Sequence, residues 1–473
     1  THMRNRSSLG GRRLTPIRLA TALLAVSIFA CDSDKLLTVT DPDVARPDAL
    51  TGVAAIPTLR AGAIGDFGVA YNGSNADVEQ VHMSALIADE FINTETFPTR
   101  IEIDQRAMSL TNTSLNTTFY DLQRARASAE RALGAYKEFA KTAADSAGYP
   151  EILALASLSY SLFAENYCGA VPASAQLADG SLEFGPALST TQLLDSAASK
   201  ANQALAVTGA PLTAAFRQLA QVAKGRALLN KGDYAGAAAA VAGVTTTFQY
   251  NYTHSETSGR QNNGTWLLTQ SVGRFGVANV EAGVGLPYQS EGNVKAAVFD
   301  PRVADSLARR GTNTKGFDGT TDQWVQAKFP LRASPITIAD GVEARLIEGE
   351  AALKLGDAAG ALGILNTLRS TAALLSLRGY AANSLPALAL QGTASAQLDQ
   401  LMKERAYWLF LTSHRLGDLR RLVRQYGRPV NSVFPNGPYF KGGTYGNNVN
   451  APVPFSEQNN PSYTPGSCVQ TQA

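Results

Sequence analysis

Apolar residues recur at helical spacing over much of this chain. Between residues 118 and 140 they follow the i, i+3, i+4 pattern of one helix face, at Leu122, Ala125, Ala129, Leu133 and Tyr136. Residues 151–166 are apolar on nearly every side, which predicts a central, buried helix. The helical pattern also covers residues 191–208, 211–231, 340–369 and 394–426. The sequence therefore predicts a mostly α-helical fold.

An internal repeat adds detail to this prediction. Residues 224–237 read KGRALLNKGDYAGA and residues 348–361 read EGEAALKLGDAAGA. We expect the glycine of each Gly-Asp step to end one helix in a left-handed conformation and the aspartate to cap the next. Each copy therefore predicts a helical hairpin of the tetratricopeptide kind, turning at Gly232-Asp233 and Gly356-Asp357. A tandem array would repeat about every 34 residues, so these hairpins belong to a larger fold.

Two long segments lack helical periodicity. Residues 245–335 are rich in Gly, Asn, Thr and aromatic residues, and the tail 427–473 is rich in Pro, Gly and Asn. We expect long loops with short strands there, interrupted by one helix start at Asp300-Pro301-Arg302. Irregular segments on a helical scaffold commonly carry binding residues.

The N-terminus has the features of an export signal. A stretch with several arginines precedes the apolar run Leu19 to Ala30, which as a helix would reach only about 18 Å and is too short for a bilayer core. Cys31 follows in a sequence that resembles a lipobox. We predict a lipoprotein signal peptide over 1–30, a lipidated Cys31, a tether over 31–48 and a single domain over 49–473.

The charge balance changes when this signal is set aside. The whole chain has 41 Lys and Arg against 39 Asp and Glu. Removing the five arginines of the signal leaves 36 against 39, a formal charge of −3. The basic character therefore belongs to the signal and gives no reason to expect nucleic-acid binding.

Two cysteines, Cys168 and Cys468, remain after Cys31. Export would place them in an oxidising compartment, where a disulfide is expected. Because the sequence does not show whether they are close in space, two unpaired buried thiols remain the alternative.

The sequence contains none of the common catalytic motifs. His82, His254 and His414 have no metal-ligand spacing, and there is no nucleophile elbow, phosphate loop or cysteine pair at zinc spacing. We therefore expect no metal, no cofactor and no enzymatic activity. A surface glycosidase remains an alternative, because its two carboxylates can be distant in sequence.

Four stretches, in order, resemble the SusD/RagB family. Residues 404–421 (ERAYWLFLTSHRLGDLRR) resemble its helix signature, although Trp408 stands where the family usually has Glu. The other three are the Asp300-Pro301-Arg302 block with residues 326–329, the helix 343–351, and the closing PVPFSEQNNP at 452–461. From the residues themselves, we interpret Glu404, Arg405, Arg415 and Asp418 as ion pairs on helix faces.

The resemblance implies a SusD-like fold with four tetratricopeptide-like hairpins and a loop-rich half that holds the ligand. It further implies an outer-membrane, cell-surface lipoprotein that delivers a nutrient to a SusC-like TonB-dependent barrel. The ligand would be a glycan or, as in some relatives, an oligopeptide. A tetratricopeptide-like scaffold that binds a protein or peptide partner is the alternative.

Aromatic rings in the loop-rich segments are the predicted ligand-binding residues. A ring face matches the C–H face of a sugar. The candidates are Trp266, Tyr288, Trp324, Tyr439 and Tyr445. The alternative for each is that it pins a loop onto the helices. Trp408 is excluded because it lies within a helical segment, where packing explains it.

Overall fold

The computed structural model describes residues 50–176, 181–280, 283, 285–307, 313–464 and 466–473. The fold described here is that of the unit Thr51–Ala473. The predicted signal peptide 1–30, Cys31 and the tether 31–48 lie outside the described residues. Within the described part of the chain, no helix combines the length and apolar character needed to cross a membrane.

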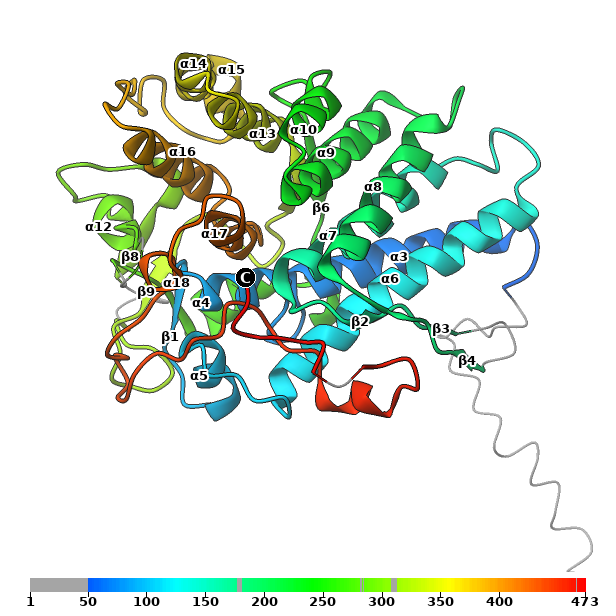
Figure 1. Ribbon diagram of the computed structural model, residues 1–473, viewed down its shortest axis with the longest axis horizontal. Coiled ribbons are helices and arrows are strands. Elements are labelled where there is room, and N and C mark those ends of the chain that lie inside the picture. Colours follow the sequence, from blue (N-terminus) through cyan, green and yellow to red (C-terminus); the bar gives the residue numbers. More distant parts are fainter. Residues whose placement is uncertain (1–49, 177–180, 281–282, 284, 308–312, 465) are drawn as a thin grey trace, which may run out of the picture. The chain divides into compact units, whose positions relative to one another are not determined.

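Four pairs of helices form the scaffold (Figure 1). Each pair packs against the next, and the last two pairs are linked through α10 and α13. The pairs are α3 (Ala55–Asn72) with α6 (Thr113–Phe139), α7 (Tyr149–Asn166) with α8 (Thr190–Ala206), α9 (Ala214–Lys231) with α10 (Tyr234–Val241), and α13 (Gly341–Lys354) with α14 (Ala358–Ser370). The mostly helical fold predicted from the sequence is confirmed.

Local sequence explains how these helices begin and pack. The side chain of Asn112 caps α6 by accepting a hydrogen bond from the backbone N–H of Leu115 at 3.0 Å. Ser189 and Gln192 form a capping box at the start of α8. α7 is buried along almost its whole length, as its apolar sequence predicts, and small residues of α8 such as Ala197 and Ala201 pack in the core.

The two repeated turns have the predicted geometry. Gly232 and Gly356 have φ values of 84° and 93°, in the left-handed region that favours glycine. The carboxylate of Asp233 accepts from the N–H of Gly236 at 2.9 Å, and that of Asp357 accepts from Gly360 at 2.7 Å. Both hairpins predicted from the repeat are confirmed.

Shorter elements complete the fold. The other helices are α4 (Gln80–Ile87), α5 (Pro98–Asp104), α11 (Gly264–Trp266), α12 (Tyr288–Gly292), α15 (Ala372–Leu377), α16 (Ala394–Trp408), α17 (Arg415–Arg424) and α18 (Val430–Val433). Single turns of other helix types occur at Gly259–Gln261, Leu267–Ser271, Pro301–Val303 and Phe455–Asn459. The expected helix start at Asp300 is thus a 3-10 turn of three residues.

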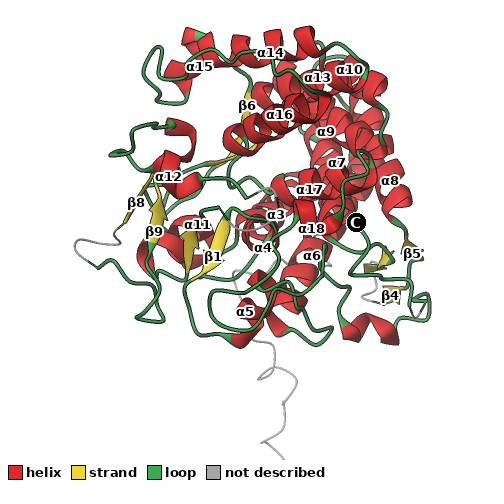
Figure 2. Cartoon of the chain, turned by 60° about the vertical axis from the view of Figure 1, so that its left-hand side comes forward, coloured by secondary structure: helices red, strands yellow, loops and turns green. Residues whose placement is uncertain are grey.

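The described strands are short and pair two by two, all antiparallel (Figure 2). The pairs are β1 (Phe91–Asn93) with β7 (Phe275–Val277), β6 (Gln249–Tyr252) with β10 (Ile336–Asp340), β2 (Val171–Pro172) with β5 (Ala187–Leu188), β3 (Ala175–Gln176) with β4 (Leu182–Glu183), and β8 (Asp305–Leu307) with β9 (Trp324–Gln326). Four of these strands lie in residues 245–335, so the loop-rich segment with short strands is also as predicted, and β10 directly follows it.

Helix α17 carries charged residues into the interior. Residues 415–422 are all buried. Arg415 forms a two-point ion pair with Asp89, both distances 2.7 Å, and Arg421 binds Glu350 at 2.8 Å. The residues predicted to form ion pairs do so, but the pairs join separate elements in the core and do not lie along one helix face.

Candidate functional site

A cavity of about 700 Å³ opens in the loop-rich half, a size typical of small-molecule sites. We call it the loop-side cavity. Its walls come from β6, from the segment around the 3-10 turn Pro301–Val303, from residues 327–337 and from the turn that follows α15. The lining residues are Gln249, Asn251, Phe299, Pro301, Arg302, Ala304, Ala327, Lys328, Phe329, Pro335, Thr337, Leu377, Arg378, Gly379, Tyr380, Ala381 and Ser384.

Two aromatic side chains give this cavity apolar faces. Phe299 is 38% exposed, which is high for such a large apolar ring. Tyr380 is half-buried and packs on Trp408, with ring centroids 6.3 Å apart. Trp408 is itself buried, as expected for a packing residue, so the Tyr380 ring contacts the core.

Polar groups without an internal partner line the same space. The side-chain amide of Gln249 forms no hydrogen bond to any residue that the structure describes. The hydroxyl of Ser384 is buried and has no partner. In contrast, the amide of Asn251 is held by the hydroxyl of Thr337, which donates to its Oδ1 at 2.9 Å. The cavity therefore offers both free and pre-oriented hydrogen-bonding groups.

Three cations, Arg302, Lys328 and Arg378, line the cavity, and each has different partners. Arg302 donates to Glu404 and to Asp300, each at 2.6 Å, and this pairing holds its pKa above the usual range. Arg378 is paired with Asp340. Lys328 donates to the carbonyl of Phe410. Burial lowers the pKa of Lys328 to about 7, with repulsion from Arg378 as the second cause, so this amine titrates near neutral pH.

This arrangement suits binding of a neutral polar molecule. No Asp or Glu side chain is among the described residues that line the cavity, whereas glycoside hydrolysis needs two carboxylates beside the scissile bond. Across the described chain, no group of three or more His, Cys, Asp or Glu side chains could hold a metal ion.

Two of the five predicted ligand-binding rings are core residues in this structure. Tyr288 is fully buried and stacks on Phe410, with centroids 5.1 Å apart. Tyr439 is 3% exposed, and its hydroxyl donates to the carboxylate of Asp104 at 2.7 Å. A ring without an exposed face cannot stack on a ligand, so the prediction is corrected for both residues. Each pins its loop to the interior.

The other three predicted rings are half-buried, but they do not line the loop-side cavity. Trp266 donates its indole N–H to the carbonyl of Pro330 at 3.1 Å, and Arg332 lies over its ring. Trp324 belongs to β9. Tyr445 packs edge-on against Tyr439, with centroids 5.1 Å apart. The structure thus does not gather the five rings into one platform.

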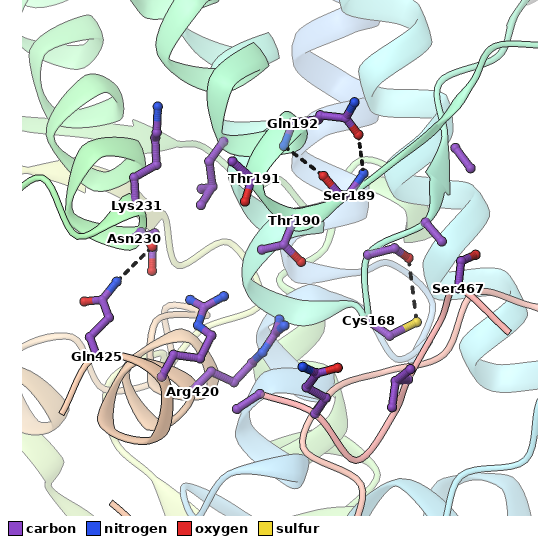
Figure 3. Close-up of a pocket in the computed structure, with 18 of the residues that line it drawn as sticks. Cys168, Ser189, Thr190, Thr191, Gln192, Asn230, Lys231, Arg420, Gln425 and Ser467 are labelled. Carbon is purple, nitrogen blue, oxygen red and sulfur yellow. Dashed lines mark hydrogen bonds between the residues drawn. The ribbon is translucent and has the colours of Figure 1, made fainter. Parts of the chain in front are cut away.

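The structure joins Cys168 and Cys468 in a disulfide across 300 residues of sequence. Cys168 follows α7, and Cys468 belongs to the C-terminal tail. Figure 3 shows Cys168 at the wall of a second cavity. The disulfide thus fixes the tail beside the helix pairs.

The Asp300-Pro301-Arg302 block and residues 326–329, both identified from the sequence, supply part of the cavity wall, but the sequence did not indicate a binding site there. Tyr380 follows Gly379, which has a φ of 73° and marks a turn, but it lies outside the two loop-rich segments from which the binding rings were predicted. Phe299 directly precedes the Asp300-Pro301-Arg302 block. These two signals were available, but no sequence feature brings Gln249 to the same cavity.

The comparison with solved structures identifies the fold. No protein-family model matches the chain, and no curated protein matches it. Among solved structures, a SusD-like carbohydrate binding protein from Bacteroides fragilis aligns with a TM-score of 0.61 at 14% identity, covering 87% of this chain and 99% of that one.

Two further structures give the same result. A SusD-like protein from Bacteroides fragilis aligns with a TM-score of 0.57 at 14% identity, covering 85% of this chain and 94% of its own. A SusD-like carbohydrate binding protein from Bacteroides vulgatus gives 0.55 at 15% identity, with 78% and 83% covered. The chain has the SusD-like fold, which confirms at the level of structure the resemblance drawn from its motifs.

Proposed function

We propose that this SusD-like chain is a binding protein that captures a saccharide in the loop-side cavity and delivers it to a SusC-like TonB-dependent transporter. One observation carries the proposal: aromatic faces and hydrogen-bonding groups without partners line one cavity of about 700 Å³. Two of the solved structures with this fold are described as carbohydrate binding proteins.

The lining residues suggest how a sugar would be held. Phe299 and Tyr380 can each present a ring to the C–H face of a pyranose, which removes apolar area from water. The amide of Gln249 and the hydroxyl of Ser384 can exchange hydrogen bonds with sugar hydroxyls. Because the Ser384 hydroxyl is buried without a partner, a bound hydroxyl would remove an existing cost as well as add a contact.

The proposal includes a cell-surface location and no catalysis. A lipid on Cys31 would anchor the protein to the outer membrane. Delivery requires release of an unchanged ligand, and the described lining residues supply no carboxylate pair for hydrolysis.

Calorimetric titration of the purified protein with a panel of neutral oligosaccharides, followed by analysis of the recovered sugar, tests binding and turnover together. The proposal expects binding of at least one sugar and its recovery intact. A panel of oligopeptides provides the competing ligand class. Saturable binding of peptides with no sugar binding, or cleavage of the sugar, would overturn the proposal.

Affinity capture from detergent-solubilised outer membranes tests the transport partner. The proposal expects a TonB-dependent barrel to co-purify in stoichiometric amount with the lipidated chain. Capture of a soluble protein in its place would favour a helical scaffold over a transporter lid.

A further inference from the structure

The second cavity, of about 560 Å³, lies beside helices of the scaffold (Figure 3). We call it the helix-side cavity. It is lined by the N-terminus of α8, the last residues of α9, the C-terminal half of α17 and the tail fixed by the disulfide. It shares no lining residue with the loop-side cavity.

The charged side chains among its described lining residues are all cations. Lys231, Arg420 and Arg424 line it, and no Asp or Glu side chain is among its described lining residues. The partner of Lys231 is Asp195, whose side chain is about half exposed and lies outside the lining. The two arginines therefore decide the chemistry of the cavity.

Arg420 is a buried cation without a carboxylate partner. Its Nη1 donates to the carbonyls of Ala164, Glu165 and Tyr167 at 2.9, 2.6 and 3.0 Å, where α7 ends. These carbonyls carry only the partial negative charge of a helix C-terminus. Its Nε is buried and has no acceptor. The adjacent Arg421, in contrast, is paired with carboxylates of Glu350 and Asp418.

Arg424 lies one helical turn beyond Arg420 and lines the same cavity. It is half-buried, and its guanidinium forms no hydrogen bond or ion pair with any residue that the structure describes. Burial lowers the pKa of Arg420 to about 9, with repulsion from Arg424 as the second cause. Burial and then repulsion from Arg421 lower the pKa of Arg424 to about 10. Both stay protonated at neutral pH. Glu165, which is paired with Arg226, attracts both, but neither forms an ion pair with a carboxylate that the structure describes.

The N-terminus of α8, which also lines the cavity, supplies further hydrogen-bond donors. α8 begins at Thr190, and its 17 residues give a helix dipole whose positive end meets the cavity. The capping box of Ser189 and Gln192 satisfies the third backbone N–H of the helix. The N–H groups of Thr190 and Thr191 are left without an intrahelical acceptor, as in helix N-termini that bind anions.

We propose that the helix-side cavity binds a small oxyanion, a carboxylate or sulfate group, between Arg424, the buried Arg420 and the N-terminus of α8. This site is separate from the proposed saccharide site and does not depend on it. The group can belong to an acidic sugar or to a free ion, since the cavity has room for a monosaccharide around the anionic group.

The test is calorimetric titration of the full chain with sodium sulfate, galacturonate and neutral galactose at constant ionic strength, with melting curves in parallel. Arg424→Gln removes one cation that has no internal partner, so the fold should persist. Without added anion, its melting temperature should equal that of the wild type or rise slightly, because like-charge repulsion is removed. Arg131→Gln is the matched control, since Arg131 is an exposed cation on α6.

The proposal expects sulfate or galacturonate to bind and to raise the melting temperature. Arg424→Gln should weaken that binding about ten-fold or more, as loss of a charged hydrogen bond does, and Arg131→Gln should not. Galacturonate binding more tightly than both sulfate and galactose would identify an acidic sugar as the ligand. Sulfate binding as tightly as galacturonate would identify a free oxyanion.

Three results would overturn the proposal. The first is no binding of either anion. The second is equal binding by wild type and Arg424→Gln. The third is a similar loss in Arg131→Gln, which would make the effect general charge screening. Failure of neutral oligosaccharides to bind the loop-side cavity would leave these outcomes unchanged, so the two proposals are tested separately.

Discussion

Arg405 of α16 and Asp418 of α17 form a two-point ion pair in the core, with Nε–Oδ2 and Nη2–Oδ1 distances of 2.9 and 3.0 Å. Both side chains are 2% exposed. Asp418 also binds Arg421 at 2.8 Å, and both arginines reach Glu350. These ion pairs of the helix signature thus stabilise the contact between α16, α17 and α13.

Asp418→Asn should destabilise the protein by about 3–5 kcal/mol, because it leaves two buried arginines short of a carboxylate. Denaturant unfolding measures this loss. Asp399→Asn is the control, since Asp399 forms the same kind of pair with Arg428 but its side chain is 54% exposed. The control should lose no more than about 1 kcal/mol. Equal losses in both variants would contradict the role assigned to the buried network.

Gly356→Ala should destabilise the protein by about 1–2 kcal/mol, because its φ of 93° lies in the left-handed region. Nothing lies within 4 Å of a Cβ built there, so the cost is conformational. Gly363→Ala, on an exposed face within α14 and equally free of contacts, should stabilise by up to about 1 kcal/mol. Unfolding curves that shift both variants in the same direction would refute the assigned turn.

The sequence predicts local turns well, but it does not predict the ion pairs between distant segments. The turns at Gly232-Asp233 and Gly356-Asp357 depend on residues three or four apart, so their geometry was predictable. The partners of Arg302 and Arg415, which are Glu404 and Asp89, are set by packing between distant segments. The incorrect prediction of Tyr288 as a ligand-binding ring has the same cause. Its Gly-rich neighbourhood indicates a loop, but only the tertiary structure shows that the ring is buried in the core.

Replacing both Cys168 and Cys468 by serine should lower stability by about 2–5 kcal/mol, because the disulfide constrains a very long loop of the unfolded chain. The difference between wild-type and variant unfolding free energies under non-reducing conditions measures the effect. Free thiols found by peptide mapping of the wild type, or an unchanged unfolding free energy, would contradict the covalent link.

The carboxyl group of Glu90 should make stability depend on pH. Burial raises its pKa to about 8, although the N–H of Leu411 donates to it at 2.9 Å. The unfolded chain releases this proton near pH 4.3. Between these values the folded state binds more protons, so this contribution to stability falls as pH rises, by up to about 1.4 kcal/mol per pH unit.

Glu90→Gln keeps an amide oxygen for Leu411 and removes the titration. The stability of the variant relative to wild type should therefore increase steadily from about pH 5 to pH 8. Denaturant unfolding at several pH values gives this difference. A difference that is constant across the range would show that Glu90 does not hold its proton in the folded state.

The central claim is that the loop-side cavity holds a saccharide, and Phe299→Ala with calorimetric titration tests it most directly. Phe299 is 38% exposed and lines the cavity, so its removal should leave the melting temperature unchanged within about 2 °C. For an oligosaccharide that binds the wild type, affinity should fall about ten-fold, the loss expected for a stacking ring. Phe184→Ala, which removes a 49% exposed ring outside the cavity, should bind normally. Wild-type affinity in Phe299→Ala, or an equal loss in Phe184→Ala, would contradict the account.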